Sequence, residues 1–575
     1  MNMKYINKFA VLIMFFATMT SCTDLTENAY SIIVSDNYYN SKTAVLRSAM
    51  LPFEHAFWSI GPRQVVCELS SDQIGTWARD GWFTEERWEQ LHYHSWDWDH
   101  IDIQTEWEGC YKGIIKANTV IKDLQSLDPS KFGMTQNEMN VLIAQSMALK
   151  NWFYLRLLDQ FRNVPLMRDA DDFDGAYTQV TPKHLFDFIE DELKLALTYL
   201  PIKDGNNGNG IYQGQWNQAA VAALLVRLYL NAEKWIGEDR YSDCEIYANK
   251  IINGEYGFYE LESTWDAVFD WKNDQSNEVI YAFTGSYGHS HWHYDGNMYW
   301  HTVPTNSRPF FKAFQQNDFN AKYAVQPSMD NTDQEFDFKL GKFVKKFQKY
   351  PNDYRLIRYK NLGNSSREGM FLFGYLDYEE DGQTKQVTSP VGNYILYLRD
   401  QVGSFQGRAP GLPPSKPDSN IKSGDFNSGW HFVKYPIYGD NEEGKKEADY
   451  VEIRLAEIIY SLAECKFRAG QVDEAAKLLN KVRKRNYPAA NHEEYLYIPN
   501  GAITLTADEF LDEWGREFFA EGRRRTDLIR WNKFSSERWW DKQPDKGNYT
   551  EIFPIPRTVM VVSRDLKQNE GYKEF

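Results

Sequence analysis

Two stretches of the chain combine aromatic side chains with polar groups in a pattern that favours binding over catalysis. Sugars present flat C–H faces and rings of hydroxyl groups, so a site for them needs aromatic platforms edged by carboxylates, guanidinium groups and amides. Core packing is the alternative for any single indole, because aromatic residues fill protein interiors first. The candidate ligand-contacting residues are Asp72, Trp77, Arg79, Trp82, Trp96 and Trp98 in the first stretch and His291, Trp292, Tyr294 and Trp300 in the second.

Metal binding is less well supported than carbohydrate binding. His289, His291 and His293 alternate, so on a strand they would share one face and could hold a metal ion. Only Asp295 offers itself as a fourth ligand. The acidic run at 169–174 resembles a calcium loop but lacks the glutamate that should close it. We therefore expect no metal and no cofactor.

Catalysis is also poorly supported. Asp97, Asp99 and Asp102 are the carboxylates that a glycosidase could use across a scissile bond. Acids this close in sequence usually share solvent instead. The sequence contains no Gly-rich phosphate loop, serine nucleophile elbow or HExxH motif. We expect a protein that is not an enzyme.

Helical periodicity must supply the elements that position these residues. It predicts helices over 40–57, 106–127, 137–161, 182–200, 216–230 and 241–252. Residues 450–485 match a tetratricopeptide (TPR) unit through Leu462, Ala463, Gly470, Ala475 and Leu479.

The stretch 256–449 has a different pattern. It carries only short β-like runs, such as 278–283 and 394–398, between turn residues. The predicted fold is mostly α: a TPR-like helical-pair scaffold with a large irregular, loop-rich inserted lobe that contains short strands.

A charged helix is predicted near the C-terminus, over 506–531. Thr506 and Glu509 have the spacing of a capping box, and apolar residues recur at helical intervals behind them. Glu521 precedes Arg525 by four residues, the favoured order for a helical ion pair. Many charged residues line one side of this helix, and we expect that charged stripe to be buried in the domain rather than exposed to solvent.

The chain start indicates export. Lys4 and Lys8 precede a short apolar run that ends at Cys22, the pattern of a secretory signal peptide with a lipobox-like cleavage site. We expect a signal peptide over 1–21, a lipidated tether over 22–39 attached through Cys22, an N-terminal region over 40–255 with the aromatic loop 68–98, the lobe over 256–449 and a C-terminal region over 450–575.

Bulk properties exclude one class of partner and leave one question open. The net charge of −17 argues against nucleic acid, which is bound by basic surfaces. The remaining cysteines, Cys67, Cys110, Cys244 and Cys465, show neither zinc-site spacing nor a disulfide framework, although one bridge among them stays open.

The residues Glu517, Glu521-Gly522, Arg524, Asp527-Leu528 and Arg530-Trp531 resemble the C-terminal signature of the SusD/RagB family of outer-membrane nutrient-binding lipoproteins. The chain end, with Pro554-Ile555-Pro556, Gln568-Asn569 and Gly571-Tyr572, is similar too. Ser563-Arg564 and Glu570 depart from the residues common there, which puts the geometry of that loop in doubt.

The resemblance implies a function and a partner. It implies a non-catalytic glycan-binding lipoprotein on the outer membrane, facing the cell exterior and held by lipid at Cys22. It also implies delivery of the glycan to a SusC-like TonB-dependent β-barrel transporter, with the helical scaffold as the contact face. The alternatives are a TPR-type adaptor that binds only protein and a peptide-binding lipoprotein at the same membrane.

Overall fold

The computed structural model describes residues 38–80, 86–171, 178–203, 214–286, 298–315, 319–327, 349–416, 419–445, 447–563 and 565–573. The predicted signal peptide, Cys22 and the start of the tether lie outside these residues. No helix among the described residues is long and apolar enough to cross a membrane.

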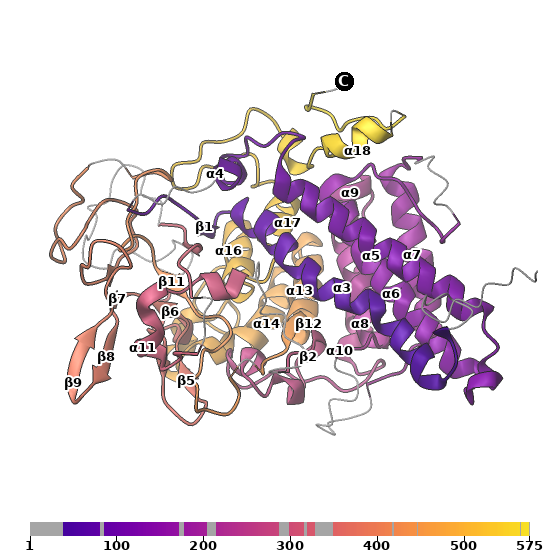
Figure 1. The fold of residues 1–575 in the computed structure, drawn as a ribbon, viewed down its shortest axis with the longest axis horizontal. Helices are drawn as coiled ribbons and strands as arrows, with labels where there is room; N and C mark the ends of the chain where they lie inside the picture. The colour runs from indigo at the N-terminus through magenta and orange to yellow at the C-terminus, as the bar shows by residue number, and fades with distance from the viewer. Residues whose placement is uncertain are drawn as a thin grey trace, which may run out of the picture.

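Helices form most of the regular structure (Figure 1). They are α3 (Lys42–Leu69), α4 (Glu86–Tyr93), α5 (Ile101–Ser126), α6 (Gln136–Phe161), α7 (Pro182–Tyr199), α8 (Gln218–Leu230), α9 (Ala232–Ile236), α10 (Tyr241–Ile252), α11 (Arg308–Phe311), α13 (Leu455–Arg468), α14 (Val472–Arg483), α15 (His492–Tyr495), α16 (Ala507–Glu517), α17 (Arg524–Arg530) and α18 (Arg557–Val562).

The strands are short and pair two at a time, always antiparallel. The pairs are β1 (Ile74–Gly75) with β3 (Ala324–Val325), β2 (Val279–Phe283) with β12 (Tyr450–Arg454), β4 (Lys360–Asn361) with β5 (Arg367–Glu368), β6 (Phe371–Leu372) with β11 (His431–Phe432), β7 (Gly374–Tyr375) with β10 (Tyr397–Leu398), and β8 (Asp377–Glu380) with β9 (Gln383–Gln386).

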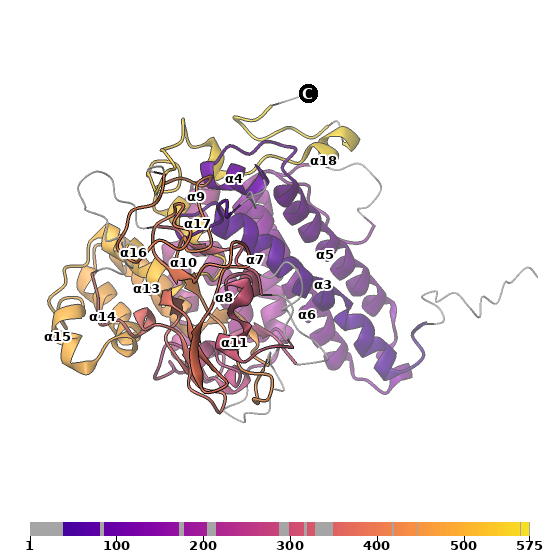
Figure 2. The same ribbon diagram turned by 60° about the vertical axis from the view of Figure 1, so that its left-hand side comes forward.

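The long helices stack in sequence order into a scaffold of paired helices. Helix α3 packs on α5, α5 on α6, α6 on α7, α7 on α8 and α8 on α10. Helix α10 then packs on α13, and α13 on α14. The stack therefore continues across the loop-rich segment that separates α10 from β12 in the sequence. Figure 2 shows α3, α5 and α6 side by side at one end of this scaffold. This arrangement confirms the predicted mostly-α, TPR-like fold.

Local sequence explains where these helices begin. Thr135 accepts a hydrogen bond from the backbone of Glu138, whose side chain returns to the backbone of Thr135, so α6 begins with a complete capping box. Pro182 opens α7, where its missing N–H costs nothing. Both helices begin within one residue of the predicted start.

Two predicted helix boundaries are wrong, and one of them is the start of α5, which begins at Ile101 rather than at 106. The first helix was expected to end near Phe57, but α3 runs on to Leu69 through Pro62. Val65, Val66 and Leu69 are buried beyond that proline, so the packing of this last stretch outweighs the hydrogen bond that Pro62 cannot make.

The segment between α10 and β12 forms the loop-rich lobe at the left of Figure 1. It has a small apolar core of its own, which includes Phe311, Phe319 and Tyr359. Strand β2 lies in the run predicted over 278–283. It pairs with β12, the strand that leads directly into α13. Of the run predicted over 394–398, only Tyr397 and Leu398 pair as a strand.

The charged C-terminal helix is broken in two. Helix α16 ends at Glu517 and α17 begins at Arg524, with Gly522 in a left-handed conformation (φ 73°) between them. The predicted helical pair between Glu521 and Arg525 is therefore wrong. Glu521 instead pairs with Arg454 at 2.9 Å, while Arg525 donates to a backbone carbonyl. The expectation that the charged stripe presses into the domain is confirmed, because its acids and bases are buried.

Candidate functional site

The first predicted platform residue, Trp77, lies in the interior. Its side chain is 0% exposed and packs edge-on against Trp540, with ring centroids 5.7 Å apart. The guanidinium of Arg79 lies 5.2 Å from the same indole and donates to the carbonyl of Lys322. Burial lowers the pKa of Arg79 to about 9. These two side chains offer a ligand no open face in this structure.

Asp72 is also occupied, because it forms an ion pair with Arg524. Its two carboxylate oxygens accept from Nε and Nη2 of Arg524, at 2.7 and 2.9 Å. This bidentate pair joins the segment after α3 to the first residue of α17. Both residues had been singled out in the sequence, one as a ligand contact and one as part of the C-terminal signature. The structure makes them partners of each other.

Trp96 and Trp98 are covered by the end of the chain. Trp96 is 4% exposed, and its indole N–H donates to the hydroxyl of Tyr572 at 2.7 Å. Trp98 is 8% exposed, and its carbonyl accepts from the backbone of Arg557. The expectation of open indole faces at Trp77, Trp96 and Trp98 is thus corrected. Segments distant in sequence bury these rings, and no local pattern reveals that.

The other candidates fall beyond the described part of the chain. Trp82, His291, Trp292 and Tyr294 lie outside the described residues, and so does the side chain of Trp300. The alternating histidines of the metal hypothesis lie there as well. Among the residues that the structure describes, no cluster of three or more metal-ligating side chains occurs.

Tyr394 and Gln406 gather at the surface around Asp80, which precedes Trp82 by two residues. The carboxylate of Asp80 accepts a short hydrogen bond from the hydroxyl of Tyr394 and another, at 2.7 Å, from the amide of Gln406. Tyr394 is half-buried, and burial raises its pKa well above the ordinary value, so the phenol stays protonated. The cluster offers a ring, a carboxylate and an amide at one place on the surface.

Two further tyrosines lie on the neighbouring strands, and we group them with these residues as the tyrosine cluster (Asp80, Tyr375, Tyr394, Tyr397 and Gln406). Tyr375 on β7 and Tyr397 on β10 stand opposite each other in the strand pair. Their half-buried rings meet edge to face, 4.7 Å between centroids. Opposed residues of a two-stranded ladder hold fixed relative positions, so these rings are preformed rather than adaptable.

Asp425 fixes the loops that carry the cluster. Its buried carboxylate accepts from the backbone of Phe405, Gln406 and Asn427. Asn427 in turn accepts from the backbone of Tyr397 at 2.8 Å. Burial raises the pKa of Asp425, and the three backbone donors lower it in part. One buried carboxylate thus ties the loop of Gln406 to the strand of Tyr397.

The sequence analysis missed the tyrosine cluster. Tyr394 and Tyr397 lie in the run that it interpreted only as a strand, and Tyr375 lies in a stretch without periodicity. The sequence carries no local signal for it, because Tyr375 and Tyr397 become neighbours only through the pairing of β7 with β10.

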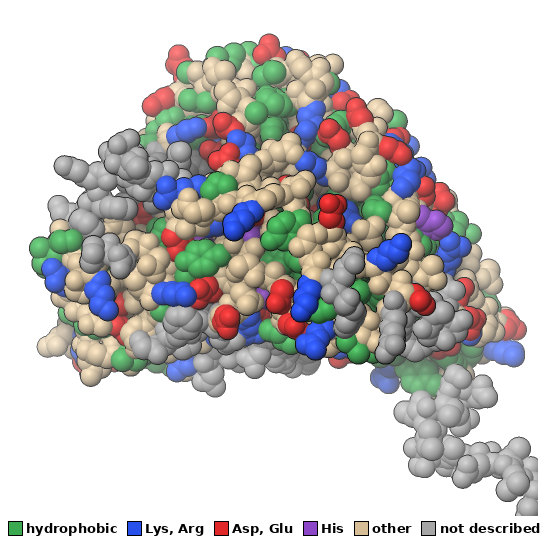
Figure 3. Space-filling model, turned by 90° about the horizontal axis from the view of Figure 1, so that it is seen from above, with side chains coloured by type: hydrophobic (Ala, Val, Ile, Leu, Met, Phe, Trp, Pro, Cys, Tyr) green, Lys and Arg blue, Asp and Glu red, His purple; other side chains and the backbone are tan. Residues whose placement is uncertain are grey.

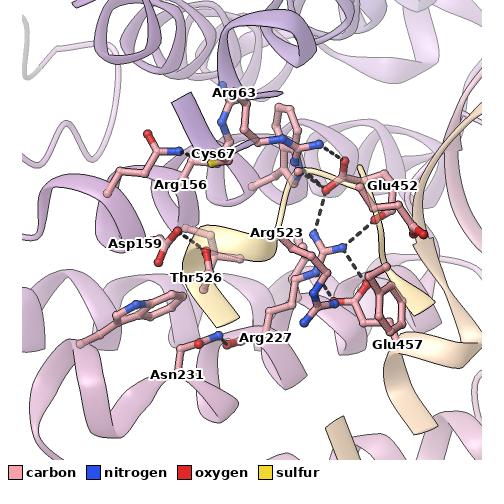
Figure 4. A pocket seen from close by; sticks show the side chains of 18 residues that line it. Arg63, Cys67, Arg156, Asp159, Arg227, Asn231, Glu452, Glu457, Arg523 and Thr526 are labelled. Atoms are coloured by element: carbon pink, nitrogen blue, oxygen red, sulfur yellow. Dashed lines mark hydrogen bonds and ion pairs between the residues drawn. The ribbon is translucent and has the colours of Figure 1, made fainter. Parts of the chain in front are cut away.

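A polar cavity of about 110 Å³ lies inside the scaffold, lined from α3, α6, α8, β12 and the connection between α16 and α17 (Figure 4). Glu452 accepts from Arg63, Arg227 and the indole of Trp152. Burial alone would raise the pKa of Glu452, but the two guanidinium groups outweigh it and hold the pKa at about 2.

The other lining cations are neutralised in the same way. Arg156 pairs with Glu106, and Arg523 pairs with Glu457 and Asp527. Each arginine of the cavity therefore has a carboxylate already. The cavity belongs to the internal ionic framework of the scaffold and leaves little for a ligand to satisfy.

The surface in the view from above carries interspersed acids and bases rather than one extended patch of either sign (Figure 3). Such mixing agrees with the exclusion of nucleic acid drawn from net charge, because phosphate backbones bind to continuous basic surfaces. A flat ring system with a few hydrogen-bonding groups suits a neutral ligand better.

A TPR-like scaffold with a loop-rich lobe and a buried C-terminal ionic framework defines a class of helical binding proteins. Within that class the chain belongs to the SusD family, whose sequence model matches residues 196–572. A second model, described as starch-binding associating with outer membrane, matches residues 65–230. The family expected from the sequence is thereby confirmed.

Individual relatives agree with this assignment. The starch-binding protein SusD of Bacteroides thetaiotaomicron is 28% identical over 376 residues, which cover 63% of this chain. The match spans 61% of the length of that relative.

Solved structures share the fold. NanU of B. fragilis superposes with a TM-score of 0.67 at 16% identity, over 95% of this chain and 100% of its own. A laminarin-binding SusD-like protein gives 0.60 at 18% identity, over 93% and 100%. Surface glycan-binding protein A of Bacteroides uniformis gives 0.62 at 15% identity, over 92% and 99%.

Proposed function

We propose that this protein is a cell-surface glycan-binding lipoprotein that captures an oligosaccharide or polysaccharide without chemical change and delivers it to a SusC-like TonB-dependent β-barrel transporter. Membership of the SusD family, matched over residues 196–572, carries the proposal. Relatives named for binding starch or laminarin support a glucan among the ligands to be tested first.

The tyrosine cluster supplies the ligand face in this proposal, with Asp80 from the aromatic loop 68–98 and its other members from the lobe over 256–449. Covering roughly 100 Å² of ring with a sugar contributes about 2.5 kcal/mol at 25 cal/mol per Å². Two or three rings give a modest affinity once the cost of association is deducted. That magnitude suits capture followed by release. Trp82, Trp292, Tyr294, His291 and Trp300 remain predictions for the same face.

Affinity electrophoresis of the lipid-free protein against a panel of polysaccharides, starch and laminarin included, tests the proposal. Tyr375→Ala and Tyr397→Ala should each weaken retention about tenfold or more, because each removes a ring worth more than 1.4 kcal/mol. Tyr199→Ala, which removes an exposed tyrosine at the end of α7, is the matched control. Wild-type retention in both cluster variants would rule out this site.

The anchor and the partner belong to the same proposal. Lipid at Cys22 would hold the protein to the outer membrane, and the second family model's description supports that membrane. The exposed apolar residues Leu46, Met50, Leu51 and Trp58 lie along one face of α3, and Trp58 exposes 50% of its surface. Helix α3 is the first long helix after the tether, so this face stands where a membrane-embedded partner can reach it.

Disrupting α3's exposed face separates the two binding roles. The double variant Met50→Glu and Trp58→Glu should lose copurification with the transporter and keep polysaccharide retention. Loss of both, with unchanged thermal stability, would favour one shared surface and contradict the assignment of separate faces. Peptide retention without polysaccharide retention would favour the alternative, a peptide-binding lipoprotein.

A further inference from the structure

Two of the four cysteines beyond Cys22 meet in the core of the scaffold. Cys244 lies on α10 and Cys465 on α13, on opposite sides of the loop-rich segment in the sequence. Both are fully buried free thiols. Helix α10 packs directly on α13, and the neighbouring Cys465 thiol adds to the rise in the pKa of Cys244.

A neighbouring ion pair fixes the register of the two helices at this point. Glu245 and Lys466, each one residue further along its helix, join at 2.5 Å. Two helices packed with axes about 8–10 Å apart, and with Cα atoms at a radius of about 2.3 Å, bring facing Cα atoms to roughly 3.5–5.5 Å. That range overlaps the span of about 4.4–6.8 Å that a disulfide bridges.

The other two cysteines have partners of a different kind. The thiol of Cys110 donates to the carboxylate of Glu106, and the sulfur of Cys67 accepts from the amide of Gln160. The Cys244 thiol donates to the backbone carbonyl of Val226, a bond that a disulfide would replace. Among the described residues, only the joint between α10 and α13 brings two cysteines next to each other. This joint is also where the helical stack resumes after the inserted segment.

We propose that Cys244 and Cys465 form a disulfide when the protein folds outside the cytoplasm. The two thiols give up two protons and two electrons, and an S–S bond forms between their sulfur atoms. The oxidant, a protein or glutathione disulfide of the oxidising compartment, is reduced to two thiols. The proposal goes beyond ligand binding and takes from the proposed function only the export of the chain.

The timing follows from burial. Burial raises the pKa of the Cys244 thiol well above its ordinary value, so the closed joint holds almost no reactive thiolate. Exchange must occur before α10 and α13 close on each other. The finished bond then closes a long loop that contains the whole lobe, and it constrains the unfolded chain accordingly.

The test compares the exported, lipidated protein with residues 23–575 produced in a reducing cytosol. Both are labelled with a maleimide in denaturant and analysed by mass spectrometry after proteolysis. We expect four labelled cysteines in the cytosolic protein and two in the exported one, with a peptide cross-linked between Cys244 and Cys465. Oxidation lowers the mass by about 2 Da. A labelled Cys22 in the exported protein would contradict lipidation but would not change the count for the other four cysteines.

Reduction provides the second measurement. Dithiothreitol should lower the melting temperature of the exported wild type by several degrees and leave the double variant Cys244→Ser and Cys465→Ser unchanged. Four labelled thiols after export, and again after refolding with oxidised glutathione, would overturn the proposal. Polysaccharide retention, measured on the same samples, reports on the proposed function independently.

Discussion

The scaffold and the lobe use charged residues in opposite ways. In the scaffold, Glu513 and Arg483 pair with both side chains fully buried. In the lobe, Glu380 and Lys385 pair across the β8–β9 hairpin with side chains about half exposed. Each pair joins a carboxylate to a cation, but only the first pair is removed from water. The difference teaches that charge in this chain is structural where helices meet and incidental where hairpins meet solvent.

The contrast extends to aromatic residues. The C-terminal segment covers Trp96 and Trp98, and lobe residues together with Trp540 bury Trp77. Tyr375 and Tyr397 instead stay half-buried on paired strands of the lobe. These three indoles therefore stabilise the framework, and the two half-buried phenols are the rings that the proposed ligand face uses. A change in one region should alter stability, and a change in the other should alter binding.

The largest expected effect is the loss of a carboxylate from the scaffold cavity. Glu452→Ala leaves Arg63 and Arg227 facing each other without their shared partner. We expect the free energy of unfolding to fall by about 3–5 kcal/mol, the usual cost of an uncompensated buried charge. Urea denaturation measures this change in the free energy of unfolding. Glu368→Ala, at an exposed position on β5, is the control and should have little effect.

The next effect is a cavity in place of an indole. Trp77→Ala should cost about 3 kcal/mol of unfolding free energy, because Trp540 can collapse only in part into the space. The rigid backbone nearby limits that collapse, since a Cβ on Gly429 would already stand 2.2 Å from the Trp77 ring. Polysaccharide retention by the folded variant should equal that of the wild type. Selective loss of retention at unchanged stability would instead restore Trp77 as a ligand contact.

The buried His431 should make the stability of the folded protein depend on pH. Burial and the nearby cation of Arg79 lower the pKa of His431 to about 3. An unfolded histidine binds a proton below about pH 6.5, but the folded one does not until about pH 3. The stability that His431 contributes is therefore present above pH 6.5 and lost as the pH falls, by up to about 1.4 kcal/mol per pH unit.

Comparing His431→Asn with the wild type isolates that contribution. The amide retains a donor for the carbonyl of Thr302, which accepts from His431 in the structure, but it cannot be protonated. Urea denaturation at pH 7, 6 and 5 should show a smaller loss of stability in the variant. Burial raises the pKa of Glu68 and Asp449 to about 7, so their contributions run in the opposite direction and cancel in the comparison. Parallel slopes for the two proteins would contradict the assignment.

Much of the fold could be predicted because its signals are local. Thr506, which caps α16, and the opening Pro182 mark the starts of α16 and α7. The C-terminal signature identified the family for the same reason: Arg524, Asp527 and Arg530 are close in sequence and all lie on α17.

The errors arose where partners are distant. Periodicity could not show that Gly522 breaks the charged helix, or that Glu521 turns to Arg454. Nor could composition show that Tyr572 would cover Trp96. The candidate site was least predictable, since Tyr375 and Tyr397 become neighbours only through the pairing of β7 with β10.

The smallest expected effect completes the comparison of buried and exposed charge. Lys385→Ala removes the exposed partner of Glu380 on the β8–β9 hairpin. Water and salt already screen this pair, and holding two long side chains in one geometry costs entropy, so the urea midpoint should not change measurably. Lys434→Ala is the buried counterpart and should lower the midpoint, because Lys434 of the lobe pairs with Glu521 at 2.9 Å with its side chain only 3% exposed. Equal midpoints for the two variants would show that burial does not set the contribution of charge here.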